Sequence, residues 1–448
     1  MTPEHHRILL VRTDRIGDTL LTIPAVTALR QQFPDAFIAF LCQPYTEPMV
    51  QRISGLNQVL IYEKEGKHKG WHGLELLSRE LSSYRFDSTV VFFPRVSLLW
   101  TLWRAGIPRR IGTGFRWYSF LLTDRVMEHR KECLKHETDY NLNLLSNLLG
   151  NTNPVPRFEF NEDHELSHDW KKLQNQYGVG PDYAIVHAGS GKSAPNLSLE
   201  QYRILIEKLL QETKWQLLLT GSTEEAAINQ HFMEKIPGDQ IVNFSGKLSL
   251  VQLMECIRNA RLLITSSTGP LHLADAQNTP VLGFFCPLPP HTPARWGPYQ
   301  QREWVVKPEL DSPGRCRMKN CPYGGCLQQL TYRQIEEAID QYNKAIKIKN
   351  DYARAYSNLL FILNYKINFD LNEYLSEAKR FRLNCGKVKK NLHIKYQHEE
   401  SPKKLKIGFV SSDFGNHPGG YFTLSTIENL ERKILSYLLT QLLIEMMK

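Results

Sequence analysis

The sequence has no long hydrophobic run. None of the apolar stretches in its 448 residues reaches the roughly 20 residues that a helix needs to span a bilayer. The chain passes from Met1 through charged residues directly into Ile8–Val11, without the apolar core of a signal peptide. These absences lead us to expect a cytoplasmic protein.

The cysteines show little of the spacing that disulfides or metal sites require. Most of the eight are isolated, so we interpret them as reduced residues that pack in the core. Cys316, Cys321 and Cys326 form a regular C-x4-C-x4-C cluster. A zinc site needs a fourth ligand and usually a tighter spacing. We therefore expect ordinary thiols and no metal, with zinc as the alternative.

Positive charge is in excess but is not concentrated in one tract. The net charge is +9, and most of the excess lies after Thr331. Scattered basic residues are typical of a solvated face, so we do not expect nucleic-acid binding; attraction to anionic lipid is the alternative. The hydrophobic content of 42% and aromatic content of 10% are those of a folded globular protein.

Short apolar runs alternate with helical patterns along the first three quarters of the chain. Such alternation predicts parallel sheets covered by helices on both faces. It stops at a polar stretch around Pro154 and Pro156, then restarts and continues to about Leu330. We therefore expect two successive Rossmann-type domains with a cleft between them. The predicted strands are 7–12, 36–42, 58–62, 88–93, 183–187, 215–220, 240–244, 261–265 and 280–285, and the predicted helices include 19–33, 74–83, 141–149, 199–212, 224–233 and 250–259.

Three short segments place a glycine-containing turn between a predicted strand and a helix. They are Arg15–Pro24, His187–Leu197 and Ser266–Ala274. A helix start beside a glycine offers free N–H groups and the positive end of a dipole, which suits a phosphate or a developing anion. The three turns together suggest an enzyme that holds a nucleotide diphosphate in one half and activates an acceptor in the other.

Asp18 is the carboxylate best placed to act as a general base. It follows Gly17 where strand 7–12 passes into a helix, so its side chain can face the cleft. A sugar hydroxyl that attacks an anomeric carbon must lose its proton, and a positioned Asp can accept it. The alternative is that Asp18 only caps its helix. Arg12 and Arg15 flank the turn and could hold an anionic acceptor, or could be solvated.

The second and third turns carry candidate residues for a diphosphate. Gly189–Ser193 ends in Gly-Lys-Ser, but Val186 stands where a P-loop needs glycine. Ser190, Lys192 and Ser193 still precede a helix and suit a diphosphate; a flexible surface loop is the alternative. In the third turn Gly269 lets the backbone approach a ligand, and His272 lies in the first helical turn behind Pro270.

These segments resemble glycosyltransferase family 9, the ADP-heptose:lipopolysaccharide heptosyltransferases of Gram-negative bacteria. The resemblance covers roughly residues 5–330 and rests on motifs that occur in the same order. They are Gly17-Asp18 with Pro24, the Gly-Ser-Gly-x-Ser-Ala-x-Asn run at 189–196, Gly221 with Glu225, Thr268-Gly269-Pro270-x-His272 and Pro293–Pro298.

The resemblance implies a GT-B fold with the acceptor on the N-terminal domain (1–155) and the ADP-sugar on the C-terminal domain (160–330). It implies transfer of a heptose or related sugar, with inversion, to a lipopolysaccharide core or similar lipid-linked glycan. Asp18 would be the base, and no cofactor or metal would take part. The enzyme would work in the cytoplasm or peripherally on the inner membrane. The donor-binding residues would be Ser190, Lys192, Ser193, Glu225, Ser267, Thr268, Gly269 and His272, and the acceptor-binding residues Arg12 and Arg15.

Two positions depart from the family pattern. The family often has a lysine where Pro195 stands and an Asp where Ser267 stands. A different function therefore stays open, namely a non-catalytic binding or scaffold protein with a degenerate cleft.

The end of the chain resembles a different family. Residues from about 338 to 425 are similar to the junction between tetratricopeptide repeats and the catalytic region of O-linked N-acetylglucosamine transferases (family 41). The motifs are Tyr352–Leu360, Leu363–Tyr365 and Ile407–Pro418, in which His417 matches an active-site histidine of that family. We expect a helical repeat-like segment at 331–385, which could bind a protein partner, and a truncated fragment at 386–448. A protein O-GlcNAc transferase fragment is thus a further alternative.

Overall fold

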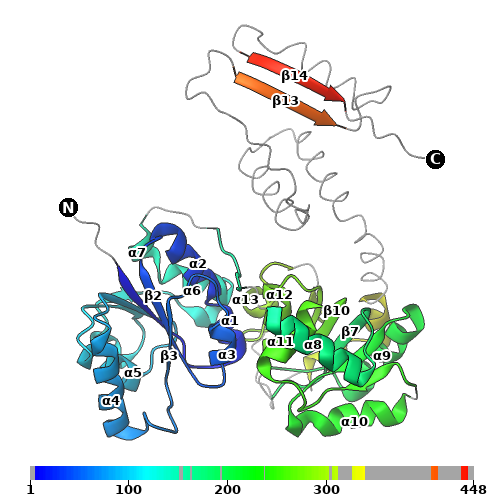
Figure 1. The fold of residues 1–448 in the computed structure, drawn as a ribbon. Helices are drawn as coiled ribbons and strands as arrows, with labels where there is room; N and C mark the ends of the chain where they lie inside the picture. Colours follow the sequence, from blue (N-terminus) through cyan, green and yellow to red (C-terminus); the bar gives the residue numbers. More distant parts are fainter. Residues whose placement is uncertain are drawn as a thin grey trace. The chain divides into compact units, whose positions relative to one another are not determined.

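The computed structural model describes residues 6–150, 155–161, 164–191, 194–236, 238–301, 305–310 and 325–338, and two strands at 405–411 and 435–441. The chain forms two units, Met1–Asp351 and Tyr352–Lys448 (Figure 1). In the second unit, β13 (Leu405–Ser411) and β14 (Leu435–Gln441) pair in parallel. All that follows concerns the first unit.

The first unit begins with a six-stranded parallel sheet in the order β3-β2-β1-β4-β5-β6. Apolar runs such as Ile8–Val11 form its central strands, buried on both faces as parallel strands require. The strands are β1 (Arg7–Val11), β2 (Phe37–Cys42), β3 (Gln58–Ile61), β4 (Ser88–Val91), β5 (Arg109–Thr113) and β6 (Asp124–Val126). The helices are α1 (Ile16–Leu20), α2 (Ile23–Gln32), α3 (Glu47–Val50), α4 (Gly70–Ser83), α5 (Val96–Arg104), α6 (Glu137–Asn143) and α7 (Ser146–Leu149), with a 3-10 helix η1 (Trp117–Leu121).

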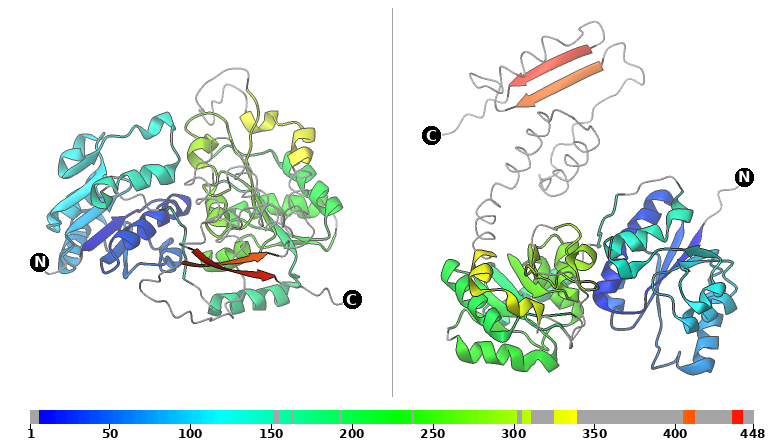
Figure 2. Two further views of the ribbon diagram at one scale, coloured as in Figure 1. Left: turned by 90° about the horizontal axis from the view of Figure 1, so that it is seen from above. Right: turned by 180° about the vertical axis from the view of Figure 1, so that it is seen from behind.

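A second six-stranded parallel sheet follows, in the order β12-β11-β10-β7-β8-β9. Its strands are β7 (Tyr183–His187), β8 (Gln216–Leu219), β9 (Ile241–Asn243), β10 (Leu262–Ser266), β11 (Val281–Phe284) and β12 (Val305–Val306). Its helices are α8 (His164–Tyr177), α9 (Leu199–Glu212), α10 (Ala226–Lys235), α11 (Leu250–Arg258), α12 (Gly269–Ala276) and α13 (Pro293–Trp296), with short 3-10 helices at Thr223–Glu225 and Cys326–Gln329. Figure 2 shows both sheets from above and from behind.

Side chains on the two faces of the first sheet belong to different cores. Ile8 and Leu10 pack with α2, whereas Leu9 and Val11 pack with α4 and α5. This alternation follows from the two-residue period of a strand. The first of these cores also contains residues of the second sheet, such as Leu263. The two sheet domains therefore share buried apolar surface.

The prediction of two parallel α/β domains is confirmed, but several element boundaries differ. The predicted helix 19–33 is two helices, α1 and α2, that meet at Leu21–Thr22. Pro24 lies in the first turn of α2, and because it has no N–H it cannot continue the hydrogen-bond ladder of α1. The predicted helix 141–149 is likewise divided into α6 and α7. Strands β5, β6 and β12 and helices α3, α5, α8 and α13 lie outside the predicted elements. Among the described residues, no helix is long and apolar enough to cross a bilayer.

Candidate active site

Both sheets reverse their strand order at the first strand in sequence. The reversal lies between β1 and β4 in the first sheet and between β7 and β10 in the second. In open α/β sheets, ligands bind in the crevice beyond the carboxyl ends of the strands at such a reversal. All three glycine-containing turns found in the sequence lie at these points, because they follow β1, β7 and β10 directly.

Asp18 lies in the first turn of α1 and is held by a buried arginine. Its Oδ1 accepts a hydrogen bond from Nη2 of Arg12 at 2.7 Å. The Nε of Arg12 donates to Oδ1 of Asp14 at 2.6 Å. The N-cap of α1 is Arg15, which makes no side-chain cap hydrogen bond, so the alternative role of Asp18 as a helix cap is not what the structure shows.

The two arginines expected beside Asp18 lie in different environments. The side chain of Arg12 is only 2% exposed, so its interpretation as a solvated residue is wrong. Burial lowers the pKa of Arg12, but the carboxylates of Asp14, Asp18 and Glu137 outweigh it and raise that pKa further above its usual range. Arg15 is exposed. The acceptor-binding role of both arginines stays a prediction.

The environment of Asp18 raises its pKa to about 6. Burial is the main cause, since it disfavours the charged carboxylate. The Arg12 guanidinium lowers the pKa of Asp18, whereas the neighbouring carboxylates of Asp14 and Glu137 raise it. A carboxylate with its pKa near 6 is ionised at neutral pH, yet is a stronger base than an ordinary Asp.

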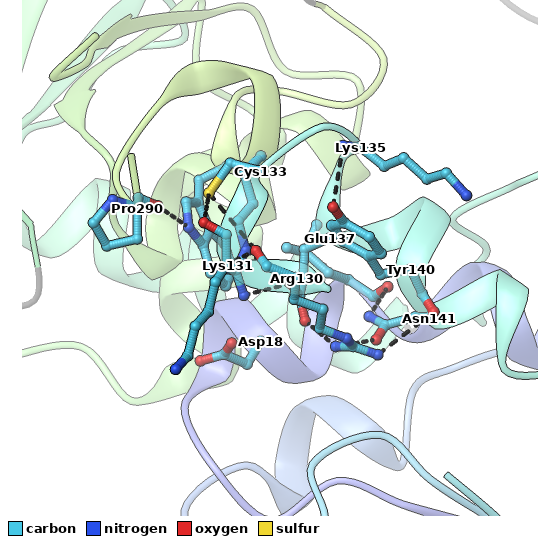
Figure 3. Close-up of polar contacts among 12 residues, drawn as sticks. Asp18, Arg130, Lys131, Cys133, Lys135, Glu137, Tyr140, Asn141 and Pro290 are labelled. Carbon is cyan, nitrogen blue, oxygen red and sulfur yellow. Dashed lines mark hydrogen bonds and ion pairs between the residues drawn. The ribbon is translucent and has the colours of Figure 1, made fainter. Parts of the chain in front are cut away.

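Glu137 at the start of α6 gathers arginines from three segments. Its carboxylate forms ion pairs with Arg130, with Arg12 at 3.6 Å, and with Arg295 at 3.0 Å. Figure 3 shows Arg130 and Glu137 pointing toward one another, near Asn141 and above the helix that carries Asp18. Burial raises the pKa of Glu137, but the three arginines together hold that pKa below its usual range. Glu137 is therefore a buried anion that fixes Arg12 behind Asp18.

The segment from α13 to Gln301 connects the second domain to the first. Arg295 donates to Oε2 of Glu137 and to the carbonyl oxygen of Arg130. His136 accepts at Nδ1 from the N–H of Thr138, so its Nε2 carries the proton donated to the carbonyl oxygen of Gly297 at 2.8 Å. Tyr299 donates to Asp139 at 2.7 Å. The Pro293–Pro298 motif therefore links the two domains, and we call this segment the strap.

The turn after β1 touches the turn after β10. A Cβ on Gly17 would lie 2.9 Å from Cδ2 of His272 and 3.4 Å from Cα of Gly269. Only glycine at position 17 permits this approach. The structure thus brings Asp18, Gly269 and His272 together from the two domains, as the cleft requires.

His272 is a neutral, buried imidazole. It is 5% exposed, and its pKa is lowered to about 3 by burial first and by the neighbouring His136 second. Its Nδ1 has no hydrogen-bond partner among the described residues. A buried polar nitrogen without a partner is costly, so this atom fits a ligand that supplies the missing hydrogen bond.

Glu225 closes the turn after β7. Its carboxylate accepts hydrogen bonds from the N–H groups of Gly191 at 3.1 Å and Ser222 at 3.0 Å. A Cβ on Gly189 would lie 2.1 Å from the same carboxyl group. The structure therefore places Glu225 beside Ser190 and Gly191 at the carboxyl edge of the second sheet. Lys192 and Ser193 lie outside the described residues.

Hydroxyl groups link the turns after β7 and β10. Thr265 donates to the carbonyl oxygen of His187 and shares a hydrogen bond with Thr268, each at 3.0 Å. Ser266 and Tyr202 both donate to Asn196, whose amide donates to the carbonyl oxygen of Ala188. Ser267 is half-buried in the same turn. The donor-binding candidates among the described residues thus occupy one edge of one sheet.

Sequence reasoning missed Glu137 and Arg130, which no motif singled out, and found Arg295 only as part of the Pro293–Pro298 match. Among the described residues, no group of His, Cys, Asp or Glu could hold a metal ion. Cys326 is buried, and Cys316 and Cys321 lie outside the described residues. The family 41-like segment with His417 also lies outside them, apart from β13.

Comparison with protein families gives two matches. The sequence model of glycosyltransferase family 9 (heptosyltransferase) matches residues 76–326, which is more than half of the chain. A TPR repeat matches residues 334–359.

Individual relatives agree with the first match. The "Putative glycosyltransferase" of Haemophilus influenzae is 28% identical over 299 residues, which are 65% of this chain and 86% of that protein. The lipopolysaccharide core heptosyltransferase OpsX of the same organism is 22% identical over 360 residues, 75% of this chain and 96% of that protein. The solved structure of the Escherichia coli ADP-heptose LPS heptosyltransferase II is 18% identical and covers 75% of this chain and 98% of its own, with a TM-score of 0.61.

Proposed function

Because the chain belongs to glycosyltransferase family 9 and is a glycosyltransferase, we propose that it transfers a heptose or a related sugar from an ADP-sugar to a lipopolysaccharide core or similar glycan. The observation that carries the proposal is the contact of Gly17 with His272. It places a carboxylate with a raised pKa beside a buried imidazole that lacks a hydrogen-bond partner.

The acceptor hydroxyl reacts on the side of the first domain. Its oxygen attacks the anomeric carbon from the face opposite the nucleotide, while the bond between that carbon and the β-phosphate oxygen breaks. Asp18 takes the hydroxyl proton, and the configuration at the anomeric carbon inverts. Arg12 keeps the Asp18 carboxylate oriented, because one guanidinium bonds both Asp18 and Asp14.

The leaving ADP is stabilised on the side of the second domain. α12 is eight residues long and begins at Gly269, so its N-terminus presents free N–H groups and a positive dipole end. His272 donates a hydrogen bond from its Nδ1 to the diphosphate. The hydroxyl groups of Thr268, Ser267 and Ser190 lie along the same carboxyl edge of the second sheet. Charge that develops on the leaving oxygen is thus met by oriented donors. No metal and no cofactor take part in this reaction scheme.

The proposed partners follow from this reaction. They are a nucleotide-sugar donor and a lipid-linked glycan acceptor, which would bring the protein to the cytoplasmic face of the inner membrane. The TPR match at 334–359 supports a protein partner for the segment after the second domain. A single repeat cannot bury its own apolar faces.

The donor part of the proposal is tested by calorimetric titration with ADP, UDP and GDP. We expect ADP to bind most tightly, because the solved Escherichia coli relative is named an ADP-heptose LPS heptosyltransferase. His272→Ala should weaken ADP binding about tenfold, the scale of one lost hydrogen bond to a charged group. Tyr332→Ala, an exposed substitution far along the chain, is the control. Equal affinity for all three nucleotides, or no binding of any, would overturn the assignment of the donor.

A further inference from the structure

Tryptophan side chains gather around one pocket on the first domain, and none of the three glycine-containing turns lines it. The pocket has a volume of about 700 Å³, and its lining includes Trp71, Trp100, Trp103, Trp117 and Phe120, with Arg110. Four of the chain's eight tryptophans are therefore in one place. Trp117 is 78% exposed, Trp71 69% and Phe120 63%. Large aromatic side chains are rarely left in water without an occupant for the surface.

The pocket is built from helices that pack on the outer face of the sheet. Trp71 lies at the start of α4, Trp100 and Trp103 lie on α5, and Trp117 begins η1. The rings of Trp71 and Trp100 meet edge to face, with centroids 4.5 Å apart. α4 and α5 pack against each other through the core beneath, so the aromatic rings sit on a rigid base.

The charged residue in the lining of the pocket is a cation, Arg110. From Val91 to Thr123 the chain has five arginines and no Asp, Glu or Lys. Arg104 and Arg109 are paired with Glu75 and Asp124 from neighbouring segments. Arg95 and Arg116 have no carboxylate partner among the described residues. A pocket lined by tryptophans, with unpaired arginines beside it, has the residue types that bind the interface of an anionic bilayer. There, aromatic rings lie at the depth of the headgroups and arginines bind the lipid phosphates.

The pocket is also connected to the candidate active site by a short segment. Phe93 follows β4, and the guanidinium of Arg12 lies 5.9 Å from its ring. The guanidinium of Arg95 lies 5.4 Å from the centre of the same ring. The next residue, Val96, lines the pocket, and Tyr118 of η1 donates to the carbonyl oxygen of Pro94 at 2.9 Å. The four residues Phe93–Val96 thus link Arg12, which binds Asp18, to the pocket.

We propose that this tryptophan pocket is a membrane-docking site that seats the first domain on an anionic phospholipid surface. The rings of Trp71, Trp103 and Trp117 enter the headgroup boundary, and Arg95 and Arg116 bind lipid phosphates. Docking there presents a membrane-bound acceptor to the turn that carries Asp18. The inference rests on the proposed function for the identity of that acceptor, but lipid binding itself requires neither donor nor acceptor.

The test is flotation of the full-length protein with vesicles, in the absence of nucleotides and glycans. Vesicles of equimolar phosphatidylglycerol and phosphatidylcholine are compared with vesicles of phosphatidylcholine alone. We expect binding to the anionic vesicles, reduced at least about tenfold in the double variant Trp71→Ala/Trp117→Ala because apolar area is lost from the boundary. Arg116→Glu should weaken binding by roughly fivefold or more, since each basic residue near the surface contributes about this factor.

The controls match these variants in exposure and charge. Tyr332→Ala removes a 52% exposed aromatic ring elsewhere, and Arg333→Glu reverses the charge of an 87% exposed arginine; both should bind vesicles as the unaltered protein does. Circular dichroism checks that the variants fold. Equal partition onto both kinds of vesicle overturns the proposal. Salt-sensitive binding that is unchanged in the tryptophan and Arg116 variants also overturns it, because the charge would then act from another part of the chain. Neither result touches the proposed glycosyl transfer.

Discussion

The side chain of Asp18 is 21% exposed and shares one arginine with Asp14. Burial and the nearby carboxylates raise its pKa to about 6, against the lowering effect of Arg12. A general base must be deprotonated to accept the proton. Since kcat/KM reports the ionisation of the free enzyme, it should fall about tenfold per pH unit below pH 6.

Two substitutions should shift the acid limb of this profile, the fall of kcat/KM at low pH, in opposite directions. Arg12→Gln removes the cation that favours the charged form, so the pKa of Asp18 rises and the limb shifts upward by about one pH unit or more. Asp14→Asn removes a carboxylate that raises that pKa, so the limb shifts downward. Steady-state rates across the pH range measure both shifts. Limbs that stay in place in both variants would show that another group controls the profile.

At the scale of elements, the close contact between the N-terminal turns of α1 and α12 requires a residue without a Cβ at position 17. Gly17→Ala places a methyl group 2.9 Å from the His272 ring, and the ring is buried and cannot swing away freely. The two turns must separate. We expect turnover to fall by about tenfold or more, because displacing a catalytic group by a fraction of an ångström lowers the rate of the chemical step strongly. Loss of thermal stability should correspond to about 1–3 kcal/mol, the usual scale of overpacking.

Gly55→Ala is the comparison for this prediction, because it changes a glycine of the same domain at a distance from the turn. Its nearest contacts to an added Cβ are at 3.6 Å on Arg30, although its φ of +88° adds strain. It should therefore lower stability but not the turnover of the folded protein. If Gly17→Ala loses stability and keeps its turnover, close contact of the two turns is not required for the reaction.

Sequence reasoning found those elements whose signals are local. An apolar run bounded by a glycine turn reveals a buried parallel strand, so β1, β7 and β10 and the turns that follow them were predicted. The division of helix 19–33 depended on Pro24, which sequence reasoning noted only as part of a motif. Glu137 could not be predicted, because its partner Arg295 is 158 residues away in sequence. Nothing in an isolated segment tells which distant arginines converge on a carboxylate.

At the scale of the whole molecule, Glu137 and Arg295 join the two sheet domains. The side chain of Glu137 is 2% exposed and that of Arg295 15%, so the pair is little screened by water. We expect a double-mutant cycle of Glu137→Gln and Arg295→Gln to give a coupling free energy of about 1–3 kcal/mol in urea unfolding. The single variant Glu137→Gln should cost about 3–5 kcal/mol, because it leaves three arginines buried without their anion.

This coupling should depend on pH in a defined direction. The pKa of Glu137 is lower in the folded protein than its ordinary value of 4.5. Its contribution is therefore complete above that value and is lost as the pH falls below it. Independent effects of the two substitutions at neutral pH would mean that the strap does not couple the domains.

The most direct measurement of the central claim is the rate of sugar transfer by Asp18→Asn beside Asp14→Asn. Both substitutions remove one carboxylate bound to Arg12, but only Asp18 lies in the turn that meets His272. With ADP-heptose and a heptose-deficient lipopolysaccharide acceptor, Asp18→Asn should lower turnover at least about 10²-fold, the scale of a lost general base. It should leave ADP affinity and melting temperature largely unchanged, and Asp14→Asn should lose less than about tenfold. Turnover by Asp18→Asn close to that of the unaltered protein would contradict the assignment of Asp18 as the base.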